Sequence, residues 1–165
     1  MTDDTPFWQR KPLDEMTRAE WESLCDGCGL CCLIKFEDID TGELIYSNIV
    51  CRHFDDQTSL CQCYDERSRK VPDCWTLTPE NIHELTWLPE TCAYRLLRDG
   101  ENLAWWHPLV SGDQNTVHEA GIGIRHNCIS EEHVHVDDWQ TFFDEMTAEE
   151  EEDAPDQPDT STGRA

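Results

Sequence analysis

The chain has 165 residues, the length of one small domain, and 36 acidic against 12 basic residues give it a formal net charge of −24. Such an acidic surface repels phosphate backbones and excludes nucleic-acid binding, and no stretch approaches the roughly 18 apolar residues of a membrane span. Only 38% of the residues are hydrophobic and ten of these are cysteine, so we expect a cross-link or a metal to supplement the core.

The first 16 residues contain acids and no apolar run, so they are no secretory signal. We therefore expect a cytoplasmic protein. In a reducing compartment, closely spaced cysteines are more often metal ligands or redox groups than disulfides. The alternative is an exported disulfide scaffold whose signal has been removed.

The predicted elements begin with a short helix over residues 17–25. Thr17 and Glu20 form a Thr-x-x-Glu capping box at its start. Gly27 and Gly29 follow and end the helix. This helix delivers the chain to a cysteine-rich loop.

Two hairpins are expected next. Apolar and polar residues alternate on either side of the turn at residues 40–42, which predicts a β-hairpin over residues 33–50. A second turn at residues 55–59 lies between Cys51 and Cys61 and predicts a smaller hairpin.

Three helices are predicted after the hairpins. A charged helix over residues 64–71 is stopped by Pro72. Threonine followed by proline and glutamate starts a helix over residues 78–85. A further helix over residues 89–98 ends at Gly100.

The C-terminal part is predicted to contain a strand over residues 121–125 and an amphipathic helix over residues 137–146. The acidic residues 148–165 have nothing to bury and are expected to be disordered. We therefore predict an N-terminal extension (1–16), one α+β domain (17–147) and this tail. The domain is small and irregular, with short helices and hairpins organised by bound metal.

The cysteines are the main functional signal. Random scatter would not place nine of ten between residues 25 and 92, so the crowding predicts metal ligands. Cys128 lies apart and is expected to be a small buried hydrophobe. The predicted ligands are Cys25, Cys28, Cys31, Cys32, Cys51, Cys61, Cys63, Cys74 and Cys92.

The stretch CDGCGLCC, residues 25–32, supports two interpretations. Cys25 and Cys28 resemble half of a zinc knuckle, whereas these two with Cys31 have the spacing of a three-ligand loop for a cubane iron–sulfur cluster. In either case the glycines adopt the backbone angles that such a loop needs. The spacing does not choose the metal.

Cys32 follows Cys31 directly, and two neighbours are strained as ligands of one tetrahedral ion because successive side chains diverge. Cys32 therefore belongs to a second centre, built with cysteines between residues 51 and 92, or it is a structural or reactive thiol.

Histidines are weaker candidates. His53 lies two residues after Cys51 and could replace a sulfur ligand. His133 and His135 alternate and would face one side of a strand, although exposed polar alternation is the commoner meaning. No nucleophile elbow, phosphate loop or zinc-peptidase helix is present, so the sequence assigns no enzyme activity.

Three motifs together resemble the CxxCxxCC cysteine-cluster family (YkgJ/YcgN type), and a fourth resembles its YcgN branch. The resemblance implies zinc or iron chelation by the cysteine cluster. It covers roughly residues 20–130. The motifs are Cys25-x-x-Cys28-x-x-Cys31-Cys32, Cys61-Gln62-Cys63-Tyr64, Arg67 followed by Val71-Pro72-Asp73-Cys74, and Trp87-Leu88-Pro89 with Cys92-Ala93-Tyr94-Arg95.

The leading prediction is a cytoplasmic protein that chelates zinc or iron, with an iron–sulfur cluster as one form of the latter. Metal binding and folding are then coupled, so removal of the metal should unfold residues 25–92. One alternative is an iron–sulfur redox or enzyme-accessory protein. The other is a zinc-stabilised interaction module whose acidic surface docks a basic protein partner.

Overall fold

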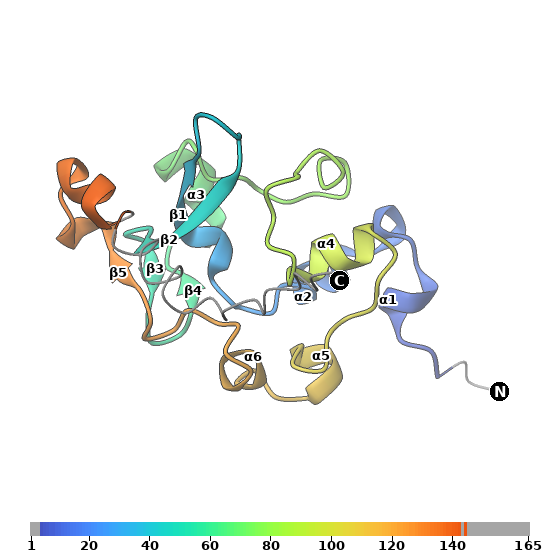
Figure 1. Ribbon diagram of the computed structural model, residues 1–165. Helices are drawn as coiled ribbons and strands as arrows, with labels where there is room; N and C mark the ends of the chain where they lie inside the picture. The colour runs from blue at the N-terminus through green and yellow to red at the C-terminus, as the bar shows by residue number, and fades with distance from the viewer. Residues whose placement is uncertain (1–3, 143, 145–165) are drawn as a thin grey trace, which may run out of the picture.

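The computed structural model describes residues 4–142 and 144 and shows a small α+β domain (Figure 1). No helix in this described part is long and apolar enough to cross a membrane. The helices are α1 Phe7–Arg10, α2 Arg18–Ser23, α3 Arg67–Lys70, α4 Ala93–Arg98, α5 Pro108–Ser111 and α6 Thr116–Glu119. The strands are β1 Leu33–Glu37, β2 Leu44–Val50, β3 Phe54–Asp55, β4 Leu60–Cys61 and β5 Ile129–Ser130. Turns of 3-10 helix lie at Leu13–Glu15, Leu30–Cys32, Tyr64–Glu66, Glu131–His133 and Val136–Asp138.

One hydrophobic cluster joins α2, α4 and the loop before α4. The rings of Trp21 and Tyr94 lie 4.7 Å apart between centroids, and the Tyr94 hydroxyl donates to the Trp21 carbonyl at 2.8 Å. Phe7 and Trp8 of α1 pack against this cluster, so the N-terminal segment covers part of it. Its buried members are Trp21, Leu24, Ile82, Leu85, Leu88 and Tyr94.

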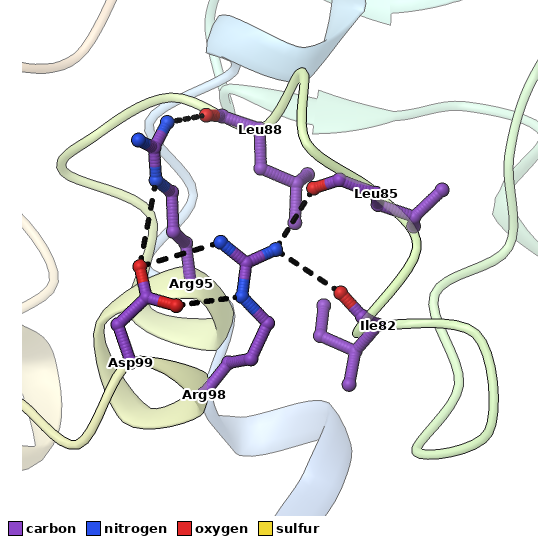
Figure 2. Close-up of polar contacts among 6 residues, drawn as sticks. All are labelled: Ile82, Leu85, Leu88, Arg95, Arg98 and Asp99. Atoms are coloured by element: carbon purple, nitrogen blue, oxygen red, sulfur yellow. Dashed lines mark hydrogen bonds and ion pairs between the residues drawn. The ribbon is translucent and has the colours of Figure 1, made fainter.

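The loop before α4 is held by arginines of that helix (Figure 2). The Arg98 guanidinium donates to the Ile82 carbonyl at 3.1 Å and to the Leu85 carbonyl at 2.9 Å, and Arg95 donates to the Leu88 carbonyl. A buried carbonyl without a hydrogen-bond donor lowers the stability of the fold, and here the arginine side chains supply the donors.

A second cluster lies under the strands, at the end of the molecule opposite α1 and α4 (Figure 1). Strands β1 and β2 pair antiparallel, β2 and β5 pair parallel, and β3 and β4 form a separate antiparallel pair. The buried members are Leu33, Val50, Phe54 and Ile124.

Several predicted elements are confirmed. Helix α2 begins with the predicted capping box, in which Thr17 and Glu20 bond to each other's backbone N–H. Both hairpins form, as β1–β2 and β3–β4. The charged segment 64–71 is helical as a 3-10 turn continued by α3.

The helix predicted over residues 78–85 is wrong, because this segment is a series of turns. The Asn81 side chain accepts from Thr78 N–H at 2.9 Å and donates to the Thr76 carbonyl at 2.8 Å. Such side-chain bonds compete with helical ones, and Arg98 binds carbonyls farther along the loop. The next helix begins at Ala93, four residues later than predicted, after a turn in which Cys92 N–H donates to the Pro89 carbonyl.

The strand predicted over residues 121–125 is also wrong. Gly121 adopts a φ of +76° and the N–H of Gly123 donates back to the Val117 carbonyl, so the chain turns after α6. The strand forms later, as β5. In the predicted 137–146 helix, residues 139–142 and 144 are helical, and residues 143, 145 and 146 and the acidic tail lie outside the described residues.

Candidate metal centre

The cysteine loop of residues 25–32 is shaped by two glycines. Gly27 and Gly29 have φ values of +75° and +79°, which favour glycine. A Cβ on Gly29 would lie 2.7 Å from Phe54 Cε2 and 2.8 Å from Ile124 Cγ1, whereas one on Gly27 would meet nothing within 4 Å. Gly29 therefore lets the loop dock directly on the second hydrophobic cluster.

Backbone N–H groups near four cysteine sulfurs favour the thiolate form of each side chain. Such N–H groups stabilise negative charge on sulfur, as in thiolate metal sites. They belong to Gly27 for Cys25, Leu30 for Cys28, His53 for Cys51, and Arg95 and Tyr94 for Cys92.

Cys25, Cys28, Cys31 and Cys92 are electrostatic neighbours, and we call them the first cysteine group. Cys92 caps α4 and joins the loop cysteines although more than 60 residues separate them in sequence. Loss of solvation is the main cause that raises the pKa of Cys25 to about 12 and of Cys92 to about 11, and it raises the pKa of Cys28 well above its usual value. Without metal the thiols of Cys25, Cys28 and Cys92 are therefore neutral at pH 7.

Asp26 lies among this group, and sequence reasoning missed it. Its side chain accepts from Cys28 N–H at 3.0 Å, and the residue is only 8% exposed. The ion pairs found in the described residues do not include it. A buried carboxylate beside thiols favours a bound cation, and an acid within a cysteine loop is the signal that could have identified it.

The other cysteines between residues 32 and 74 form the second cysteine group: Cys32, Cys51, Cys61, Cys63 and Cys74. Cys51 N–H donates to the Cys32 carbonyl at 3.0 Å, which brings these two residues together across the β1–β2 hairpin. The sulfurs of Cys61 and Cys63 lie 3.7 Å apart. Two thiolates on one tetrahedral zinc, with bonds of about 2.3 Å, are separated by about 3.8 Å.

Basic residues accompany the second group. Burial is the largest cause acting on Cys51, Cys63 and Cys74, and it raises the pKa of each thiol. Nearby cations oppose this rise. They are Arg52 beside Cys51, Lys70 beside Cys63 and Arg67 beside Cys74.

Cys31 and Cys32 link the two groups through contact of their thiols. This contact is the largest cause that lowers the pKa of Cys31 to about 7, and it raises the pKa of Cys32. Lys35 also lowers the pKa of Cys31. Cys51 and Cys61 are electrostatic neighbours of Cys32, so Cys32 belongs with the second group although it also interacts with Cys31 of the first.

The thiols of each group are neighbours but do not form a closed coordination shell. As the described residues stand, no three His, Cys, Asp or Glu side chains lie close enough together to hold a metal ion. All ten cysteines are free, and the residues Cys25 and Cys31 are exposed at the surface although surrounding protein atoms desolvate their sulfurs. Binding of a metal would therefore have to draw the thiols of a group together.

The remaining candidates lie differently. The backbone N–H of His53 favours the thiolate form of Cys51, and the His53 carbonyl accepts from Gln62 N–H at 2.8 Å. The strand expected for His133 and His135 is wrong, since His133 ends a 3-10 turn and His135 caps the next one. Both line a surface cavity of about 490 Å³ with Trp139.

Cys128 packs partly buried against the second hydrophobic cluster. Its thiol lies 3.6 Å from Oδ1 of Asp56. The same oxygen accepts from the backbone N–H of His126, and Oδ2 of Asp56 contacts the ring of His126. This contact holds the β3–β4 turn to the segment before β5.

The pattern of one protein family, described as "Putative zinc- or iron-chelating domain" and named CxxCxxCC, matches residues 24–93. A UPF0260 protein of Sinorhizobium fredii is 54% identical over 85% of this chain and 90% of its own length. One from Rhizorhabdus wittichii is 58% identical over 80% of this chain and 90% of its own, and one from Agrobacterium fabrum is 55% identical over 84% and 86%. No solved structure is a significant match.

Proposed function

Because the chain belongs to the UPF0260 family and carries its CxxCxxCC cysteine cluster, we propose that it binds zinc or iron at two neighbouring thiolate centres. The observation that supports this most is the gathering of nine cysteines, from segments far apart in sequence, into two adjoining groups. Free thiols at all ten cysteines suit a reducing, cytoplasmic setting.

The first centre uses Cys25, Cys28, Cys31 and Cys92. These residues supply four sulfur ligands, and backbone N–H groups stabilise three of them as thiolates. The buried Asp26 carboxylate adds negative charge that a bound cation offsets.

The second centre draws on five thiols, one more than a tetrahedral ion needs. Cys61 and Cys63 already have the sulfur separation of two ligands on one ion. Cys32 and Cys51 approach from the β1–β2 hairpin, and Cys74 follows α3. Cys32 is thus the residue that connects the CxxCxxCC loop to the second centre.

Anaerobic purification of the full chain, followed by elemental analysis and a visible spectrum, tests the proposal. Thiolate sets of this kind suit both zinc and iron–sulfur clusters. Colourless protein with zinc supports structural centres, and brown protein with iron and sulfide supports clusters. Protein that contains no metal and takes up none contradicts the proposal.

The exposure of Cys25 and Cys31 favours a second candidate, an iron–sulfur redox or enzyme-accessory protein. An open side at the first centre would admit an exchangeable ligand or an electron partner. This function requires a visible spectrum that bleaches with dithionite and returns on reoxidation. A colourless zinc protein contradicts it while leaving metal binding intact.

A further inference from the structure

Lys35 on β1 directs its ammonium back toward the CxxCxxCC loop. Its Nζ donates to the carbonyl of Cys31 at 3.1 Å and to that of Leu33 at 3.0 Å. The side chain is half-buried. The ammonium is therefore held beside the Cys31–Cys32 pair, whereas most lysines extend into water.

Two aromatic rings fix the same ammonium. Nζ lies 4.8 Å from the ring centroid of Trp87 and 5.2 Å from that of Tyr46. The two rings come from β2 and from the loop before α4. The Tyr46 hydroxyl donates to the Trp87 carbonyl and so joins these two segments. The attraction between a cation and an aromatic ring is stronger where the cation is partly desolvated.

The thiols that act on Lys35 come from both cysteine groups. Burial is the largest cause acting on Lys35 and lowers its pKa, and Cys31 of the first group and Cys32 and Cys74 of the second oppose this by favouring its charged form. Among other cations near cysteines, Arg52 and Lys70 act on the second group, and Arg98 is a neighbour of Cys92 in the first.

We propose that Lys35 is the charge-balancing residue shared by the two metal centres, a positioning residue rather than a ligand; this rests on the proposed function. A divalent ion with four thiolates carries a net charge of about −2. Two such centres in contact through Cys31 and Cys32 repel each other, and a fixed cation between them offsets this repulsion.

Titration of the full-length chain with cobalt(II) under anaerobic conditions, read by thiolate-to-metal charge-transfer absorption and by competition with a chelator, tests this. We expect K35M and K35Q to bind cobalt at least about tenfold more weakly and K35R to stay within about threefold of the wild type. K11M is the matched control, because it removes the same charge elsewhere in the chain, at a lysine whose ammonium pairs with Glu20 at 2.8 Å.

The glutamine variant separates charge from hydrogen bonding. Glutamine keeps an N–H donor for the carbonyls but no charge, so its rescue of cobalt affinity would overturn the proposal. Affinity within twofold of the wild type in K35M would overturn it too. If K35M does not fold, comparison of K35R with K35Q makes the same test. A wild-type chain that binds no cobalt overturns the proposed function itself, and the inference with it.

Discussion

The two cysteine groups differ in what supports them. The first is backed by the cluster around Trp21 and Tyr94, and Cys92 packs against that cluster at the start of α4. In the second, Cys32 and Cys51 flank the β1–β2 hairpin, whereas Cys61, Cys63 and Cys74 lie on or beside two-residue strands, 3-10 turns and the four-residue α3. Short elements bury little apolar surface, so we infer that the second group depends more on metal for its shape.

Removal of metal should therefore affect the two regions unequally, and this is the largest effect we expect. Chelation of the anaerobic protein should abolish amide protection in residues 51–74, while α2 and α4 retain part of theirs. The reason is that metal binding supplies about 10 kcal/mol or more to small sites, whereas hydrophobic contacts remain in the first region. Hydrogen exchange followed by mass spectrometry measures this. Equal protection in apo and metal-loaded protein would contradict it.

Single ligand substitutions should separate the two centres. Cys28→Ser and Cys61→Ser should each lose about half of the bound metal, since each removes a proposed ligand of a different four-thiolate site. Cys32→Ser should also lose about half; full metal content would make Cys32 a thiol beside the first centre. Elemental analysis measures the content, and Cys128→Ser, which should keep all of it, is the control.

Substitution of the two loop glycines tests the contact between the cysteine loop and the second hydrophobic cluster. Gly29→Ala should lower the free energy of unfolding by about 3 kcal/mol, because it combines a positive φ with a clash against Phe54 and Ile124. Gly27→Ala is the matched control and should cost about 1 kcal/mol, since only the backbone strain applies. Denaturant unfolding of metal-loaded protein compares them, and equal losses would show that the docking contact at Gly29 matters little.

Arg98→Met should weaken the first region alone. The substitution leaves the Ile82 and Leu85 carbonyls without their donor at the cost of about 1–3 kcal/mol, while methionine keeps much of the apolar stem. Hydrogen exchange of the backbone amides around residues 82–98 should accelerate more than that of residues 51–61. Uniform acceleration across both would mean that the two regions unfold as one unit.

The smallest effect concerns Cys128 at the edge of the second region. Burial and the neighbouring Asp56 carboxylate raise its pKa to about 11, so Asp56→Asn should increase its alkylation rate at pH 8 by about three- to tenfold. The raised pKa contributes stability that is present below pH 9 and lost as pH rises through 11. Mass spectrometry of iodoacetamide-treated protein measures the rate; an unchanged rate would show that Asp56 does not control this thiol.

Local patterns were sufficient where the interactions are local. The capping box of Thr17 and Glu20 and the alternation in β1 and β2 depend on residues close in sequence, and both predictions are confirmed. The 78–85 helix failed because Asn81 and the distant Arg98 take backbone groups that a helix would use internally. Nothing within the segment itself reveals a donor that lies on α4.

By itself, the sequence determined which residues are the candidates for this chemistry: the spacing of CDGCGLCC and the crowding of cysteines predict thiolate ligands, because these patterns lie in neighbouring positions. Only the tertiary structure decided how the cysteines divide into two groups. It brought Cys92 to the loop, set Cys32 against Cys51, and placed Asp26 and Lys35 beside the thiols. Those juxtapositions depend on how α4 and the hairpins pack on two separate hydrophobic clusters, and contacts across such distances leave no local signal in the sequence.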